Sequence, residues 1–249
     1  MEIKRQKFQG VLNILSFNRH FYAFGLIAMA IIIGSQYILN WNEGLFWLVI
    51  CGFIYGLTMP LIVSAYVYDF SGFYNFDWLK RMNLDDSPQN LNLNINAGFD
   101  ETSYIIKKIL PYSRLQVYDF YNAKQHTEPA ITRARKVSSV YPNTQQIDSS
   151  KIPLEDNSVD NIFLVSAIHE IRKQEERIQF LKECRRVCKP NGNVIMVEHL
   201  RDFPNFFAFT IGFTHFFSST TWKMAFKEAG FASINESKFT PFMSIFNCK

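Results

Sequence analysis

The sequence is poor in the residues that mark several common protein classes. It has 4 Cys, 11 Gly and 9 Pro among 249 residues, whereas 48% of the residues are hydrophobic and 16% are aromatic. So few cysteines do not form the disulfide framework of a small secreted protein, and so apolar a composition excludes a disordered chain. Collagen-like repeats are excluded as well. The length is that of one or two globular domains.

Basic residues are missing from a long stretch near the start of the chain. The net charge is +4, but no Lys or Arg occurs between Arg19 and Lys80. Two uncharged runs, 21–39 and 45–68, lie within this gap. Each run has the roughly 20 residues that a helix needs to cross the hydrocarbon core of a bilayer. We therefore expect residues 21–68 to form a two-helix transmembrane hairpin in the lipid bilayer, with two buried core helices as the alternative.

The flanks of these runs predict an orientation. Residues 1–20 carry four Lys or Arg, the loop between the runs carries none, and Lys80 and Arg81 follow the second run. Basic flanks stay on the cytoplasmic side. We therefore expect a multi-pass protein of the inner or plasma membrane whose basic N-terminal segment 1–20 and C-terminal domain are both cytoplasmic. Residues 69–90 are expected to be a juxtamembrane connector, with one amphipathic helix near the membrane surface.

From residue 91 onward, apolar segments alternate with segments of helical spacing. Strands are expected at 91–96, 115–118, 161–166, 193–197, 233–239 and 243–246, and helices at 102–110, 128–137, 174–188 and 221–229. This alternation predicts an α/β domain over residues 91–249, with a Rossmann-like, doubly wound and mostly parallel sheet. In such sheets ligands bind beyond the carboxyl ends of the strands.

The residues that follow the expected strands are therefore the first candidates for a site. After the strand 91–96, Gly98 has no Cβ and lets the backbone approach a ligand. The next strand ends in Asp119, whose carboxylate can accept two hydrogen bonds from a ribose diol. The pattern G-x-G-x-x-G does not occur, which disfavours a nicotinamide-dependent oxidoreductase.

Neither a metal site nor a nucleic-acid partner is predicted. Cys184 and Cys188 lie four residues apart on one expected helix, with no third Cys and no His at ligand spacing, so we interpret them as small core residues. The basic residues do not form a dense stripe interleaved with aromatic residues, as nucleic-acid binding favours.

Two longer segments resemble a known family. The sequences IPLEDNSVDNIFLVSAIHEI at 152–171 and RRVCKPNGNVIMVEHL at 185–200 are similar to the regions around strands 4 and 5 of class I S-adenosylmethionine-dependent methyltransferases, especially the quinone-biosynthesis type. The resemblance extends from about residue 91 to the C-terminus and leaves out the hairpin. It implies S-adenosylmethionine as the cofactor. By position it assigns cofactor binding to Asn96, Gly98, Asp119, Phe120, Asp148, Ser149 and Ser166.

The resemblance also implies individual roles. Gly98 would admit the methionine part of the cofactor, and Asp119 would hold the ribose hydroxyls. Phe120 would lie against the adenine face, and Asp148 would accept from the adenine amino group, with Ser149 beside it. Residues 166–169 would line the floor where methyl donor and acceptor meet.

The glycine loop departs from the family pattern. Asn94 stands where the family usually has an acid, Asn96 replaces the first glycine and Asp100 replaces the third. A carboxylate that points toward the methionine carboxylate disfavours binding, because like charges repel in a shielded site. Either Asp100 points away, or cofactor binding is weakened or lost.

Methyl transfer to some acceptors needs a base, and the chain offers several. His169, Glu170 and His215 are the expected catalytic residues, and His199 is a further candidate. Each has an alternative role in helix capping or core packing. The Phe-rich segment 202–219 predicts an apolar lid or a surface that enters the bilayer, with core packing as the alternative.

Together these patterns predict a membrane-anchored methyltransferase that acts on a lipophilic small-molecule acceptor. The acceptor atom is left open among O, C, N and S. The alternative is a non-catalytic membrane scaffold that keeps the methyltransferase fold but has lost cofactor binding.

Overall fold

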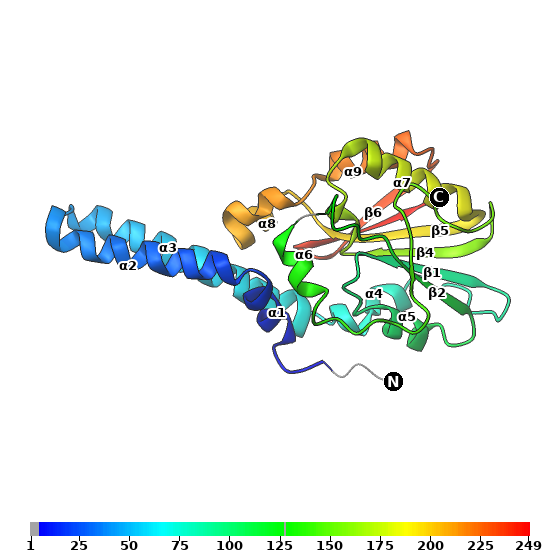
Figure 1. Ribbon diagram of the computed structural model, residues 1–249, viewed down its shortest axis with the longest axis horizontal. Helices are drawn as coiled ribbons and strands as arrows, with labels where there is room; N and C mark the ends of the chain where they lie inside the picture. The colour runs from blue at the N-terminus through cyan, green and yellow to red at the C-terminus, as the bar shows by residue number, and fades with distance from the viewer. Residues whose placement is uncertain (1–4, 127) are drawn as a thin grey trace.

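The computed structural model describes residues 5–126 and 128–249, and it shows a sheet domain from which a helical hairpin projects (Figure 1). The strands are β1 (Leu91–Asn96), β2 (Arg114–Asp119), β3 (Gln145–Gln146), β4 (Val159–Val165), β5 (Cys188–His199), β6 (Ile234–Thr240) and β7 (Met243–Cys248). They form one sheet in the order β3-β2-β1-β4-β5-β7-β6, with β7 antiparallel to both of its neighbours. The predicted doubly wound, mostly parallel sheet is confirmed.

The strand register brings the carboxyl ends of the central strands to one edge. Asn96 pairs with Asp119 at the ends of β1 and β2, and Val165 of β4 pairs with Val197 of β5. Side chains directly after these strands therefore face a common region, as expected for parallel strands.

Helices cover both faces of the sheet. Alternate residues of a strand point to opposite faces, so Ile162 and Leu164 of β4 join one core cluster, whereas Phe163 and Val165 join the other. The first cluster includes buried residues of α6 (Pro129–Ala134), α7 (Gln174–Val187) and α9 (Ser219–Glu228). The second includes residues of α4 (Asp77–Lys80), α5 (Ser103–Ile109) and α8 (Phe203–Phe209).

The connector at residues 69–90 is not the single amphipathic helix that the sequence predicted. It contains the end of a π-helical turn, η1 (Ala65–Phe70), then a 3₁₀ turn, η2 (Phe73–Asn75), and the short α4. Gly72 and Phe76 adopt left-handed conformations (φ 78° and 50°), which interrupt a continuous helix. The aromatic side chains of Phe73, Phe76 and Trp78 are buried in the second core cluster, so packing against the sheet decides this segment.

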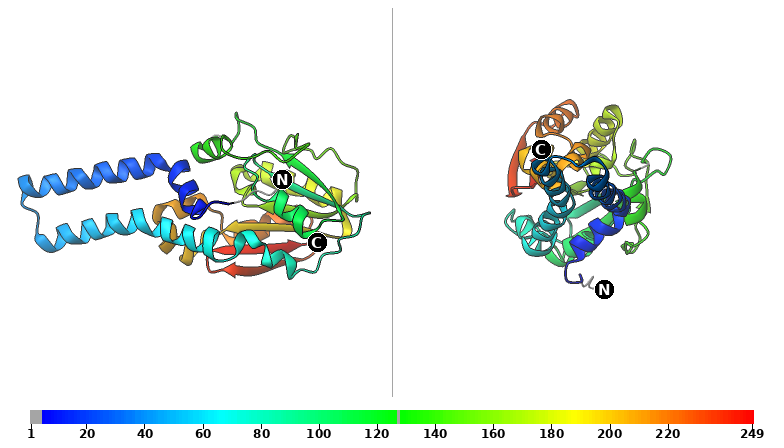
Figure 2. Two further views of the ribbon diagram at one scale, coloured as in Figure 1. Left: turned by 90° about the horizontal axis from the view of Figure 1, so that it is seen from below. Right: turned by 90° about the vertical axis from the view of Figure 1, so that its left-hand side faces the viewer.

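The N-terminal apolar runs form two long helices. A short helix, α1 (Gln9–Phe17), precedes α2 (Arg19–Leu39) and α3 (Glu43–Ser64), and α2 and α3 lie side by side and project from one end of the sheet domain (Figure 2). At 1.5 Å per residue, α2 is about 30 Å long, the thickness of a bilayer core. None of the described residues of α2 is buried, and its apolar side chains, such as Ile31 and Ile38, are exposed. The two apolar helices thus exist as predicted, whereas their crossing of a membrane stays a prediction.

Candidate functional site

The turn after β1 has the backbone shape that the sequence predicted. The Gly98 N–H donates to Oδ1 of Asn96 (2.7 Å), and this turn holds Gly98 at φ 80°, where a side chain causes strain. Asp119 lies beside it, because a Cβ at position 98 would come 2.8 Å from its Oδ2. The structure thus brings together three of the predicted cofactor residues at the ends of β1 and β2.

An arginine that the sequence analysis did not identify occupies this region. Nη1 of Arg135, at the end of α6, donates to Oδ2 of Asp119 (2.6 Å) and to the carbonyl of Ala97 (2.8 Å). A Cβ at Gly98 would lie 1.4 Å from the same nitrogen. The guanidinium therefore fills the space above Gly98 and neutralises Asp119. No motif signals this, because the contact arises when α6 folds onto the strand ends.

Asp100 points away from the strand ends and into the start of α5. Its Oδ1 accepts from the backbone N–H groups of Thr102 (3.0 Å) and Ser103 (2.9 Å), where a negative charge is favourable. Asn94 supports the same turn, since its Nδ2 donates to the hydroxyls of both residues. The effect of Asp100 on cofactor binding stays a prediction.

The residues assigned to the adenine lie at the ends of β2 and β3. Phe120 is buried, with its ring 5.4 Å from the rings of His126 and Phe180. Ser149 is also buried and donates to Oε1 of Glu176 (2.7 Å), to which Nε2 of His126 comes within 3.2 Å.

Asp148, the remaining residue of this group, is exposed. Hydrogen bonding from the Ser150 side chain, and then from the Ser150 backbone N–H (2.8 Å to Oδ1), lowers the pKa of the Asp148 carboxyl. A carboxylate with a lowered pKa is ionised at neutral pH and remains a hydrogen-bond acceptor.

Ser166 directly follows β4 and adopts a conformation that L-residues rarely adopt. Its φ is 49°, and its hydroxyl has no hydrogen-bond partner among the described residues although the atom is buried. A strained residue with an unused hydroxyl at the carboxyl end of a central strand is the kind of position where ligand-binding groups are found.

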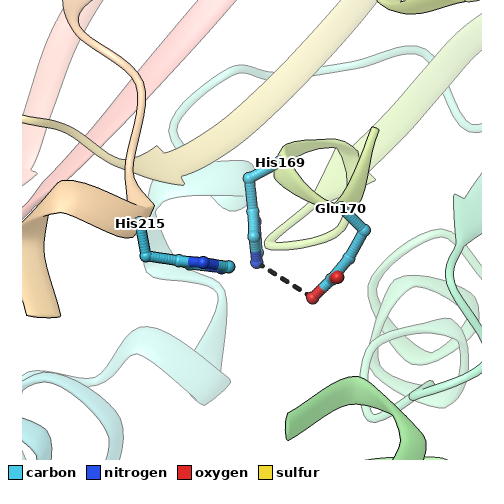
Figure 3. Close-up of side chains that lie close together, drawn as sticks. All are labelled: His169, Glu170 and His215. Atoms are coloured by element: carbon cyan, nitrogen blue, oxygen red, sulfur yellow. Dashed lines mark ion pairs between the residues drawn. The ribbon is translucent and has the colours of Figure 1, made fainter. Parts of the chain in front are cut away.

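The three predicted catalytic residues gather in one cluster, although they come from distant parts of the chain (Figure 3). His169 and Glu170 lie on the 3₁₀ turn η3 (Ile168–Glu170) after β4, and His215 ends η4 (Thr210–His215) after α8. Nε2 of His169 is 3.5 Å from Oε1 of Glu170, and the rings of His169 and His215 are 5.2 Å apart. Tertiary folding therefore joins two segments that the sequence analysis had considered separately.

A buried glutamate, Glu198 on β5, orients His169. Nδ1 of His169 donates to Oε2 of Glu198 (2.8 Å), so Nε2 faces Glu170 and His215. Burial lowers the pKa of His169, but the charges of Glu198 and Glu170 outweigh it and raise that pKa to about 10. Burial and the charge of His169 lower the pKa of His215 to about 4. Glu198 follows the apolar run of β5 directly, which is the sequence signal that could have identified it.

His199 has a structural role. Its Nδ1 lies 2.9 Å from the Phe242 carbonyl, which can only accept, so Nδ1 carries the proton and Nε2 accepts from the Tyr68 hydroxyl (2.7 Å). The ring stacks on Phe216 with centroids 5.0 Å apart. Both ring nitrogens are thus used to join η1 to the sheet.

The Phe-rich segment is partly core and partly surface. Ala208 is buried, whereas Phe203, Phe207 and Ile211 are 80%, 58% and 78% exposed. The Tyr55 hydroxyl of α3 donates to the Phe207 carbonyl (2.6 Å), so these exposed side chains lie beside the base of the hairpin.

The N-terminal helix α1 lies over the turn that follows β1. Phe17 packs against Phe99 with ring centroids 5.4 Å apart, and Nη1 of Arg133 on α6 donates to the Phe17 carbonyl (2.5 Å). A cavity of about 680 Å³ lies elsewhere, along residues 5–8 and 68–77, and none of the predicted site residues line it.

Comparison with known proteins agrees with this architecture. Residues 112–196 match a family model described as a methyltransferase domain. A solved S-adenosylmethionine-dependent methyltransferase from Aquifex aeolicus superposes with a TM-score of 0.53 at 19% identity, over 76% of this chain and 97% of that one. A solved protein from Pyrococcus horikoshii OT3 superposes with a TM-score of 0.53 at 16% identity, over 73% of this chain and 91% of that one. The search of curated proteins found no match. The fold is that of the class I methyltransferases.

Proposed function

We propose that this protein is a membrane-anchored S-adenosylmethionine-dependent methyltransferase that acts on a lipophilic or membrane-associated small molecule. One observation carries the cofactor assignment. The left-handed Gly98 lies against the carboxylate of Asp119 at the adjoining ends of β1 and β2. A glycine turn beside an acid suits a ribosylated cofactor, since the acid can accept from the ribose hydroxyls once the Arg135 guanidinium has been displaced.

The position of Asp100 supports binding. Oδ1 of its carboxylate accepts from two backbone N–H groups at the start of α5, where a negative charge is favourable. The donor brings an activated methyl group, and the protein contributes by positioning the acceptor and, where needed, by removing its proton. His169, Glu170 and His215 form the polar cluster beyond β4 at which the acceptor would be held or deprotonated.

The membrane assignment rests on the exposed apolar surface. Helices α2 and α3 are long enough to span a bilayer, and the exposed aromatic side chains of α8 lie where α3 meets the sheet domain. Exposed apolar surface of this extent favours contact with lipid. An acceptor dissolved in the bilayer would then reach the strand ends without crossing water.

Isothermal titration of the full-length protein in detergent micelles tests the cofactor assignment. We expect one S-adenosylmethionine to bind per chain and Asp119→Ala to weaken binding at least tenfold, because the ribose loses its acceptor. Asp156→Ala is the matched control, since that carboxyl is 67% exposed and pairs with Arg186. No binding by folded protein at millimolar cofactor would favour the non-catalytic scaffold.

Protease added to intact cells tests the orientation. The C-terminal domain is expected to survive, because the basic flanks place it in the cytoplasm. Cleavage of that domain before lysis would overturn the assignment.

A further inference from the structure

The cluster at the ends of β4 and β5 has an unusual composition. Two imidazoles and one carboxylate, from His169, His215 and Glu170, place ligand atoms within 4.8 Å of one another. These groups suit a first-row divalent transition metal, because imidazole nitrogen and carboxylate oxygen are both good donors to Zn²⁺, Fe²⁺ or Co²⁺.

One of the ligand separations is close to that in a coordination sphere. Ligands of a tetrahedral zinc ion at about 2.1 Å lie about 3.4 Å apart. Nε2 of His169 and Oε1 of Glu170 are 3.5 Å apart. The ligand atom of His215 lies within 4.8 Å of the ligand atoms of the other two residues, and its side chain is 31% exposed.

An unused ligand atom points to a missing partner. Oε2 of Glu170 is buried and has no hydrogen-bond partner among the described residues, and the side chain is only 7% exposed. A buried carboxylate oxygen without a partner is costly. A cation held by both carboxylate oxygens of Glu170 would satisfy it.

The surroundings orient the ligands as metal sites do. Glu198, with its side chain 2% exposed, accepts from Nδ1 of His169 and so directs Nε2 toward the centre. A carboxylate behind a ligating histidine is the usual arrangement, since it sets the tautomer and raises ligand basicity. Nη1 of Arg172 donates to the carbonyls of His169 and His215, which holds the two ligand-bearing segments together.

Carboxylates surround the two histidines. The carboxylates of Glu170 and Glu198 lie within hydrogen-bond or ion-pair distance of His169, and Oε1 of Glu128 is 3.8 Å from Nδ1 of His215. Metal binding would release the proton from Nε2 of His169.

We propose that His169, Glu170 and His215 bind one divalent transition-metal ion, which leaves a coordination position open for water or an acceptor oxygen. The site itself does not depend on the proposed methyl transfer, whereas a role in holding the acceptor rests on it. The sequence does not indicate this site, because His215 is distant in the chain from His169 and Glu170.

Metal binding to the full-length protein, stripped with chelator and held in detergent, tests the site. We expect one Zn²⁺ per chain by calorimetry, and Co²⁺ is expected to give the visible d–d absorption of a coordinated ion. Glu170→Gln and His215→Asn are each expected to weaken Zn²⁺ binding at least tenfold, and Glu198→Gln to weaken it 10–100-fold. His20→Asn is the control, because this histidine lies on α2 and contacts Arg133.

The outcomes separate this proposal from the proposed function. Thermal melting checks that each variant is folded. A stoichiometry of zero, or Zn²⁺ binding that survives the combined Glu170→Gln and His215→Asn changes, would refute the metal site. Titration with S-adenosylmethionine is measured on the same samples without metal. A failure to bind Zn²⁺ therefore leaves the result for S-adenosylmethionine unaffected, and a failure to bind S-adenosylmethionine leaves the result for Zn²⁺ unaffected.

Discussion

Replacing Arg135 with alanine is expected to tighten the binding of S-adenosylmethionine by about tenfold. The guanidinium lies on Gly98 and donates to Oδ2 of Asp119 at 2.6 Å. A ribose diol needs this carboxylate, so the cofactor must first break the ion pair and displace the arginine.

The magnitude follows from the burial of the pair. Hydrogen bonds to charged groups contribute about 1.5–3 kcal/mol. The two side chains are 28% and 10% exposed, so solvent screens the pair in part and the lower end applies. About 1.4 kcal/mol corresponds to a tenfold change in the dissociation constant.

Calorimetric titration of wild-type protein and Arg135→Ala measures this difference. Arg133→Ala is the matched control, because Arg133 lies on the same helix but contacts α1 through the Phe17 carbonyl. Weaker binding by Arg135→Ala would refute the reasoning and would make Arg135 a ligand of the cofactor.

Three further predictions concern other parts of the molecule. Gly98→Ala is expected to lower the melting temperature and to reduce cofactor binding, because a side chain at φ 80° costs about 1–3 kcal/mol. Gly34→Ala in α2 is the control and is expected to leave both unchanged, since no atom of the described residues lies within 4 Å of the added methyl group. Burial lowers the pKa of His199 to about 4, below its value of about 6.5 in the unfolded chain. The protein therefore loses stability as pH falls from 6.5 to 4, and the loss is about 2 kcal/mol at pH 5. The melting temperature of His199→Asn is expected to depend less on pH over this range. Fluorophores are attached in a Cys51→Ser background at Phe207→Cys in α8 and, as a control, at Lys227→Cys in α9. Nitroxide lipids in nanodiscs are expected to quench the first fluorophore and not the second. Equal quenching at both positions would contradict contact of α8 with lipid.

Much of the fold could be predicted because its signals are local. The run LNLNIN alternates in the period of a strand and became β1, and the apolar runs around Ile162 and Val194 became β4 and β5. The connector was predicted wrongly. There the aromatic side chains of Phe73, Phe76 and Trp78 pack on the sheet, and this tertiary packing overrides the helical spacing.

The predicted site residues were found at the strand ends, but their partners were not predictable. Gly98 and Asp119 follow strands directly, so their place in the sheet was readable. Arg135 reaches Asp119 because α6 folds back over β2, and Glu198 reaches His169 because β4 and β5 are neighbours in the sheet. Such contacts depend on how elements pack and leave no pattern in the chain.

The sequence by itself determined the two apolar runs, the alternation of strands and helices, and the polar residues at the strand ends, since each depends on spacing along the chain. Tertiary structure alone decided which charges meet. It placed Arg135 over Gly98, turned Asp100 into α5, and brought His215 to His169 and Glu170. The physical reason is that electrostatic and coordination chemistry act over a few ångströms in space, whatever the separation along the chain.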